Sequence, residues 1–275
     1  MSIKKFIPEV WAEAIERDNV QKSVFIEDCN REYEGKIEKK GDTVHILGVG
    51  KPTIKDLPKD GLIDDPEDIP DSTVTLVVDQ QKYFNYQVDN IDKAMAVGNV
   101  MAALNEETSE GISSCMDAHI ASFAKDEAVK QAFTQTQTIT SSNVFDVIDE
   151  MALALYENNV HQSTKITLTV PPRFFMIFRK RYIELDTNNS QLIKGNSIAQ
   201  YGNITIKQSN ACLREGNVDY VMMRTKRALA FVQSVKDVIA YQPEKSFKDA
   251  VKGYFLYGAK IVRPKEIIST LITYN

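Results

Sequence analysis

The sequence predicts an α+β fold in which a long two-stranded extension projects from a body of mixed helices and strands. Residues 30–61 combine two strand-forming runs with a Lys-Lys-Gly-Asp turn and a bend rich in glycine and proline. Residues 90–126 repeat apolar side chains every three or four positions, which is typical of a long amphipathic helix. From residue 136 onwards, short helical and strand-like patterns alternate, which indicates a mixed α/β domain.

The composition is that of an ordinary globular chain. Its 275 residues are 43% hydrophobic and 26% charged, enough to bury one large core or two smaller ones. The net charge of -5 argues against a dedicated nucleic-acid binder, which usually carries a large basic patch. Three widely spaced cysteines indicate reduced thiols rather than a disulfide framework. With no signal-peptide pattern and no run of ~20 apolar residues, we expect a cytoplasmic origin and no membrane partner.

The first third of the chain is expected to form two arms. Residues 1–29 contain a short amphipathic stretch with Trp11, the only tryptophan of the protein. Residues 30–89 are expected to form a long hairpin, with strands on both sides of a turn at 39–42 and a returning strand over 73–88. A lone hairpin is marginal in water and needs a partner surface, so we expect this one to lie on a neighbouring subunit. The sequence therefore indicates an assembly protein.

The tip of the hairpin is acidic and is interrupted by prolines. Three lysines lie in the same stretch, at positions 51, 55 and 59. The acids are Asp56, Asp60, Asp64, Asp65, Glu67, Asp68 and Asp71. Such a segment is expected to be solvated or held by opposite charges on another surface.

One long helix is expected over residues 90–126, because the apolar positions follow a three-and-four spacing. Its predicted buried face is Val97, Met101, Leu104, Thr108, Ile112, Cys115, His119 and Phe123. A linker rich in Gln and Thr over 134–142 then marks the best domain boundary in the chain.

The second half alternates between helices and strands. A helix is predicted with Val144, Phe145, Ile148, Met151, Ala152 and Leu155 on its buried face. A strand follows over 165–170, and Pro171 and Pro172 start a short helix whose aromatic residues face inward and whose cations face outward. Further strands are predicted at 202–208, 220–224 and 228–233, and the apolar C-terminal segments up to residue 274 are expected to be buried.

Four segments in order resemble the major capsid protein of tailed bacteriophages. They are Phe6-Ile7-Pro8-Glu9-Val10-Trp11, then Asn30-Arg31-Glu32-Tyr33-Glu34-Gly35 with Gly41-Asp42-Thr43-Val44, then Val78-Asp79-Gln80 through Asp92, and Tyr201-Gly202-Asn203-Ile204-Thr205-Ile206-Lys207-Gln208-Ser209-Asn210. Each is common by itself, and the ordered set over nearly the whole chain makes the resemblance specific.

The resemblance implies the tailed-phage capsid fold, an α+β fold with four parts. These are an N-terminal arm over 1–29, an extended β-hairpin loop over 30–89, a peripheral domain over 90–135 and 240–275, and an axial α/β domain over 136–239. The peripheral domain would hold the long helix, called the spine, beside a β-sheet that the C-terminal strands complete.

The resemblance also implies a function. Copies of the chain would self-assemble into pentamers and hexamers of an icosahedral shell that encloses double-stranded DNA without sequence specificity. A scaffolding protein and a portal would take part in assembly. The protein would be made in the cytoplasm of a bacterial host and would reside in the virion.

Contacts between subunits are expected at the arms and at charged surfaces. In the N-terminal arm the expected contact residues are Phe6 and Trp11. Complementary charges are expected between the acidic tip and the basic helix that follows Pro172. The residues concerned are Asp64, Asp65, Glu67 and Asp68 on one side and Arg173, Arg179 and Arg181 on the other.

The sequence offers no catalytic set, and we expect no cofactor and no metal. The run from Gly48 to Thr53 fails as a phosphate-binding loop, because the glycine spacing is wrong and Pro52 occupies the Ser/Thr position. Cys115 and His119 lie four apart but lack two further ligands at suitable spacing. Three alternatives remain: an encapsulin-like protein compartment, a phage tail or adaptor protein, and a cytosolic nucleotide-binding enzyme.

Overall fold

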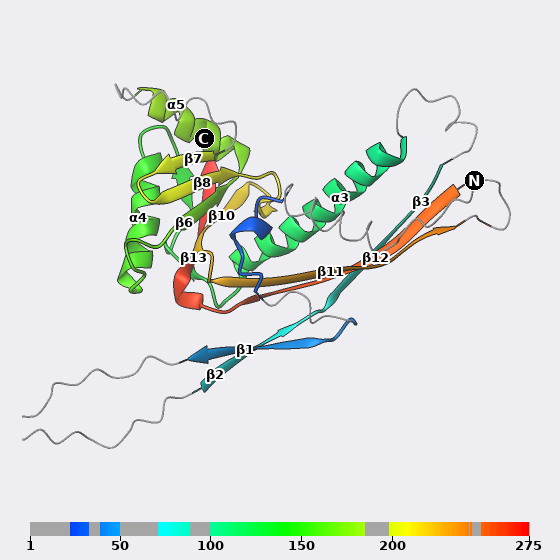
Figure 1. Cartoon of the computed structure of the whole chain (residues 1–275). Helices are drawn as coiled ribbons and strands as arrows, with labels where there is room; N and C mark the ends of the chain where they lie inside the picture. The colour runs from blue at the N-terminus through cyan, green and yellow to red at the C-terminus, as the bar shows by residue number, and fades with distance from the viewer. Residues whose placement is uncertain are drawn as a thin grey trace, which may run out of the picture.

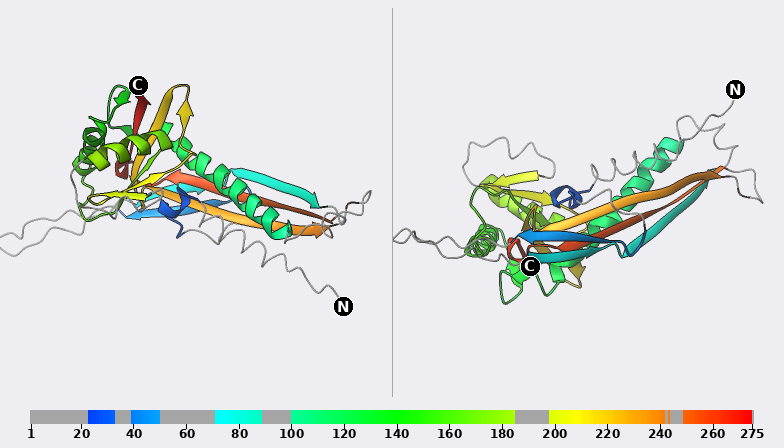
Figure 2. Two further views of the ribbon diagram at one scale, coloured as in Figure 1. Left: turned by 90° about the horizontal axis from the view of Figure 1, so that it is seen from above. Right: turned by 60° about the horizontal axis from the view of Figure 1, so that its bottom comes forward.

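The computed structural model gives the chain an elongated shape with a mixed α/β body at one end (Figure 1). It describes residues 23–32, 39–49, 71–88, 100–184, 198–241, 243 and 249–274. The predictions for the arm over 1–22 and for the acidic tip over 50–70 lie outside these ranges. From the body, α3 and a three-stranded sheet run out together in one direction, and a separate two-stranded sheet lies on the other side of that sheet (Figures 1 and 2).

The body is built on an eight-stranded mixed sheet, which the described residues form in the order β4-β13-β10-β6-β8-β7. Of the two remaining strands, β5 pairs with β13 and β9 pairs with β10. The central β10 is antiparallel to both β13 and β6, whereas β6 and β8 are parallel. The strands are β4 (Lys130–Gln131), β5 (Gln137–Ile139), β6 (Ile166–Val170), β7 (Ile198–Tyr201), β8 (Ile204–Gln208), β9 (Arg214–Glu215), β10 (Val218–Thr225) and β13 (Ile267–Tyr274).

Two helices, α4 (Val144–Glu157) and α5 (Pro172–Glu184), cover one face of this sheet. Both match the predicted amphipathic patterns. The buried side chains of α4 are Val144, Val147, Ile148, Met151, Ala152 and Leu155, five of them on the predicted face. The sixth residue of that prediction, Phe145, is half-buried and meets Phe178 of α5 edge-on at 5.5 Å between ring centroids. Phe174, Phe175 and Phe178 of α5 point into the same core.

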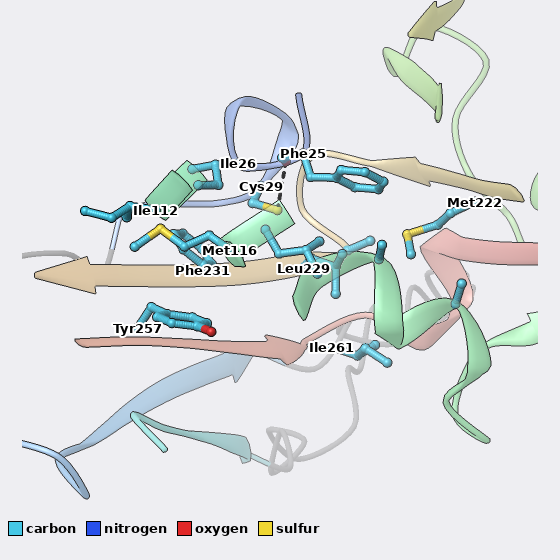
Figure 3. Packing of buried hydrophobic residues seen from close by; sticks show 14 of the residues in the cluster. Phe25, Ile26, Cys29, Ile112, Met116, Met222, Leu229, Phe231, Tyr257 and Ile261 are labelled. Carbon is cyan, nitrogen blue, oxygen red and sulfur yellow. Dashed lines mark hydrogen bonds between the residues drawn. The ribbon is translucent and has the colours of Figure 1, made fainter. Parts of the chain in front are cut away.

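The elongated part has three layers. Its middle layer is a three-stranded sheet in the order β11-β12-β3, formed by β11 (Leu229–Tyr241), β12 (Asp249–Ile261) and β3 (Gln80–Val88). Side chains alternate along β11, so that Phe231 lies in the core shared with α3 (Val100–Ser122), and Val232 packs towards the two-stranded sheet. Figure 3 shows the first of these cores, with Ile112 and Met116 of α3 close to Phe231 and Tyr257.

The buried face of the spine helix α3 is offset from the predicted one. Ile112 is buried as expected, but Thr108, Cys115, His119 and Phe123 are only half-buried. The most buried positions are Ser109, Ile112, Ser113, Met116, Asp117, Ile120 and Ala121. The prediction left out Ser109, Ser113 and Asp117, whereas this helix turns these small and polar side chains inward. Residues 90–99 of the predicted helix lie outside the described ranges, residues 100–122 are helical, and a short 3-10 turn, η2 (Phe123–Lys125), follows.

The outer layer is the two-stranded sheet of β1 (Thr43–Val49) and β2 (Asp71–Val77), in which the first part of the predicted returning strand pairs with the strand after the turn. The turn at 39–42 is present, with Gly41 at a φ of 92° and its N–H 2.8 Å from the carbonyl oxygen of Val78. The predicted strand before this turn falls largely on residues 33–38, which lie outside the described ranges. Val44, Ile46 and Leu76 bury one face of the pair against β11 and β12.

Three strands lie elsewhere than expected. The predicted returning strand over 73–88 is two strands, and the second of them, β3, pairs with β12 in the three-stranded sheet. β11 was expected among the axial strands but pairs with β12 beside α3. β13 was expected to complete the sheet beside the spine but pairs with β10 in the eight-stranded sheet. Pairing joins segments far apart in sequence, which local patterns do not specify.

Gly258 marks the closest approach between two of these layers. A Cβ atom at this position would lie 2.6 Å from the carbonyl oxygen of Val77 and 3.1 Å from the Cα of Val78. Both are backbone atoms, so they cannot rotate away as a side chain would. The chain between β2 and β3 therefore crosses β12 where only glycine fits.

We predict that Gly258→Ala lowers the free energy of unfolding by about 1–3 kcal/mol, the usual cost of overpacking a core. Gly111→Ala is the matched control, because Gly111 is exposed on α3 and a Cβ there meets nothing within 4 Å. The control is expected to gain up to about 1 kcal/mol of stability. Chemical denaturation of both variants measures the difference, and equal stabilities would contradict the close approach.

Candidate functional site

Residues 23–30, which connect to the N-terminal arm, are held in place by a buried polar network that we call the clamp. Its first member is Asp117 on α3, whose carboxylate accepts hydrogen bonds from the Ser23 hydroxyl and from the N–H groups of Val24 (3.0 Å) and Phe25 (3.2 Å). The Ser23 hydroxyl also accepts a bond from the Ile26 N–H at 2.9 Å. Burial raises the pKa of the Asp117 carboxyl, and these hydrogen bonds oppose that rise.

Arg224 on β10 is the second member of the clamp. The side chain is fully buried, its Nη2 donates to the carbonyl oxygen of Phe25 at 2.9 Å, and its guanidinium lies 5.3 Å from the centroid of the Phe25 ring. A buried arginine is costly unless it is paired and hydrogen-bonded. Its positive charge opposes the rise that burial causes in the pKa of the Asp117 carboxyl.

Two further contacts join the clamp to the sheets. Lys207 on β8 places its ammonium 2.7 Å from the carboxylate of Glu27 and 2.8 Å from that of Asp28. Burial lowers the pKa of Lys207, but its hydrogen bonds to both acids outweigh this and leave the pKa raised. Asn30 bridges to β11, since its N–H donates to the Leu229 carbonyl at 2.8 Å and its carbonyl accepts from the Phe231 N–H at 2.9 Å. The clamp thus fixes the point where residues 1–22 join the fold.

The extended loop also has a defined base. In the β1–β2 pair, Val49 lies opposite Asp71. The segment 50–70 therefore starts and ends at the same end of the two-stranded sheet. Because that sheet is packed on β11 and β12, the base is anchored to the three-stranded sheet.

The predicted basic residues lie on α5, and the structure gives them different surroundings. Arg179 is exposed and Arg181 is half-buried. Arg173 lies at the start of the helix, with its guanidinium 4.7 Å from the ring centroid of Tyr274 on β13. The structure does not bring these cations together with Asp64, Asp65, Glu67 and Asp68, nor does it place Phe6 or Trp11, since all six of these residues lie outside the described ranges.

The structure gives no geometric support, among the described residues, for the metal site or the phosphate-binding loop that the sequence brought into question. Within the described parts of the chain, no three His, Cys, Asp or Glu residues cluster in a way that would hold a metal ion. His119 instead lies between aromatic rings, edge-on to Phe123 and to Tyr257 at 5.4 and 5.3 Å, and burial lowers its pKa. Gly48 is paired with Ser72 inside a strand, whereas a phosphate-binding loop needs a turn between a strand and a helix.

None of the helices that the structure describes combines the length and the apolar character needed to cross a lipid bilayer.

Sequence reasoning missed the clamp. Asp117 was missed because the predicted helical face was offset from the buried one, although Asp117 lies one position from the buried Met116. Arg224 carried a visible signal, since it is a charged residue at the end of the apolar run Val221-Met222-Met223. An arginine in such a strand is seldom fully buried unless it has a partner. No sequence feature, however, pointed to Phe25 as that partner.

We predict that Asp117→Asn lowers the free energy of unfolding by about 1–3 kcal/mol, the range for a buried donor left without its acceptor. An Asn side chain has one acceptor oxygen, so it cannot accept all the hydrogen bonds that the two carboxylate oxygens accept. Its NH2 group would face at least one of these donors. The control is Asp126→Asn, an exposed residue whose Oδ1 accepts one bond, from the Ala128 N–H at 2.9 Å. The control is expected to change stability by less than about 0.5 kcal/mol. Thermal or chemical unfolding that ranks the two variants equally would contradict the clamp.

The comparisons with known proteins now give this fold a context. No protein-family model matches the chain, and no curated protein matches it. A solved structure from Mycobacterium phage Che8 is 25% identical, with a TM-score of 0.70 over 92% of this chain and 91% of that one. The capsid of cyanophage P-SCSP1u is 12% identical, with a TM-score of 0.67 over 92% and 88% of the two chains.

A virus-like particle from Pyrococcus furiosus shares the same architecture at 13% identity, with a TM-score of 0.57 over 95% of this chain and 98% of that one. These likenesses span nearly the whole chain. They include both the mixed α/β body and the elongated part with its spine helix. The chain therefore has the fold of the major capsid proteins of tailed bacteriophages.

Proposed function

We propose that this chain is the major capsid subunit of a tailed phage, which self-assembles into pentamers and hexamers of an icosahedral shell around double-stranded DNA. The observation that carries the proposal is a fold shared along the whole chain with phage capsid structures. Scaffolding protein and portal are the proposed assembly partners. Synthesis takes place in the cytoplasm of the host bacterium, and the assembled protein resides in the virion.

The geometry supports a mechanical role. The clamp and the β1–β2 base anchor two segments, 1–22 and 50–70, at defined points of a rigid elongated body. Segments anchored in this way can reach neighbouring subunits from a fixed starting point, which lowers the entropic cost of each contact. Many weak contacts then sum to a stable container through multivalency. In this proposal the chain has no catalytic activity and needs no cofactor.

An encapsulin-like compartment is the second candidate, because this fold also occurs in a structure described as a virus-like particle from Pyrococcus furiosus and not as a phage capsid. The two functions differ in their cargo, because a capsid encloses DNA and a compartment of this kind encloses proteins. The fold is common to both.

We predict that the purified protein forms closed shells, because the proposed contacts are repeated around every symmetry axis. Negative-stain electron microscopy of the protein expressed alone, and of the protein expressed with the neighbouring genes of its source, checks this. Nuclease-protected DNA in the shells supports the capsid, and protein cargo without DNA supports the compartment. A protein that stays monomeric in every preparation would overturn both candidates.

Intersubunit contacts of the arms remain part of the proposal. Phe6 and Trp11 are proposed to dock on a neighbouring subunit, and so are the acids of the loop tip. Exposed ion pairs are worth only about 0–1 kcal/mol each, but the contact recurs in every copy of the shell. Salt screens such pairs, with a Debye length of roughly 8–10 Å at physiological ionic strength.

We predict that replacing Asp64, Asp65, Glu67 and Asp68 by Asn or Gln slows assembly or weakens shells without unfolding the subunit. The reason is the loss of attraction between the tip and a basic surface of a neighbour. Particle yield as a function of salt, measured for the variant and the parent, tests this. Equal yields at low salt would mean that the tip is merely solvated.

A further inference from the structure

The outer face of α4 is an acidic stripe. Its exposed residues are Asp146, Asp149, Glu150, Leu153 and Glu157. The helix contains no Lys or Arg, so no cation on the helix itself offsets these charges. The stripe lines a surface hollow of about 590 Å³, whose walls include Ala152 and Tyr156. Leu153, half of whose surface is exposed, gives the hollow an apolar centre.

The outer face of α5 has the opposite character. Arg179 and Lys180 are exposed, and Met176 and Ile183 lie at helical spacing on the same side with 68% and 56% of their surface exposed. Four of the thirteen residues of α5 are cations, and its one acid is the last residue, Glu184. Met176 and Ile183 therefore give this charged face two exposed apolar side chains.

The two stripes lie on adjacent helices of one domain and match each other in kind. Each combines charges of one sign with at least one exposed apolar side chain. The helices are in contact through their inner faces, as the Phe145–Phe178 ring pair shows, and among the described residues nothing buries their outer faces. Figure 1 shows α4 along one side of the body and α5 across its end. Each copy of the chain therefore offers an acidic and a basic surface at separate places.

We propose that the α4 stripe of one copy binds the α5 stripe of the next copy, and that this contact joins neighbouring bodies around the symmetry axes of the shell. The inference rests on the proposed function and names the partner of this surface. Such a head-to-tail contact uses two different patches of the same chain and closes into a ring when the rotation fits. Charge complementarity selects the register, and Leu153, Met176 and Ile183 supply the apolar contact.

A second copy is the favoured occupant, because both complementary stripes are present in every copy. DNA would explain the cations of α5 but not the acids of α4, which repel phosphate. The acidic tip over 50–70 is the other candidate for α5, whereas α4 supplies acids on a rigid helix. Both alternatives are outcomes of the test.

The experiment reverses the charges on each side. One variant carries Asp146→Lys and Glu150→Lys, a second carries Arg179→Glu and Lys180→Glu, and a third carries all four changes. Thermal unfolding verifies that each variant folds. Sedimentation velocity and electron microscopy then measure the assembled fraction at low and high salt. The neutral pair Asp146→Asn with Glu150→Gln provides a milder version should a reversal prevent folding.

We expect each reversed pair to reduce the assembled fraction at low salt by about tenfold or more, because every contact in a ring is affected. The variant with all four changes is expected to regain assembly, since the attraction is restored with its sign exchanged. The control for net charge is Glu110→Lys with Glu127→Lys, two exposed acids outside both helices, and it should assemble like the parent.

The possible outcomes separate the two proposals. If the parent assembles and each reversed pair assembles equally well, the α4–α5 contact is overturned and the proposed function stands. The contact is also overturned if the net-charge control loses as much assembly as the reversed pairs, or if the second variant loses only its packaged DNA. It is likewise overturned if the variant with all four changes folds but does not regain assembly. A parent that never assembles would overturn the proposed function and the contact with it.

Discussion

The clamp around residues 23–30 is the constraint on which the rest of the structure depends. It buries an acid from the spine helix and an arginine from the central strand β10. Both side chains make hydrogen bonds to the backbone of residues 24–25. A buried polar group that loses its partner is costly, so the hydrogen bonds of Asp117 and Arg224 to this stretch tolerate little displacement. Because Asp117 and Arg224 come from different parts of the fold, their shared contact sets how the spine meets the body.

The layers of the elongated part follow from that placement. β10 contributes to both large cores, with Tyr220 and Met222 on the side of the spine and Val221 and Met223 on the side of α4 and α5. The three-stranded sheet beside the spine then offers its second face to β1 and β2, and Gly258 lets the backbone after β2 come close. The base of the extended loop is thus tied, through two packed layers, to the same helix that holds the clamp.

A subunit built in this way suits a shell. Its rigid parts present fixed surfaces, and its two anchored segments leave from fixed points. Shell proteins need contacts that are individually weak, so that misplaced subunits can leave, and collectively strong, so that the closed particle persists. Paired acidic and basic stripes on one domain meet that need better than one large apolar patch, which would risk aggregation.

Local patterns in the sequence were sufficient to predict α4, α5, the turn at 39–42 and the existence of the spine, because helical periodicity and turn chemistry act over a few residues. The resemblance to capsid proteins added the fold as a whole. Only the tertiary structure decided the partners of β3, β11 and β13, since an alternating strand pattern names a buried face but not a neighbour. It also decided the clamp, because the stability of a buried charge depends on a partner that the chain supplies from a distant position. Asp117 and Phe25 lie 92 positions apart and meet only when the fold is complete.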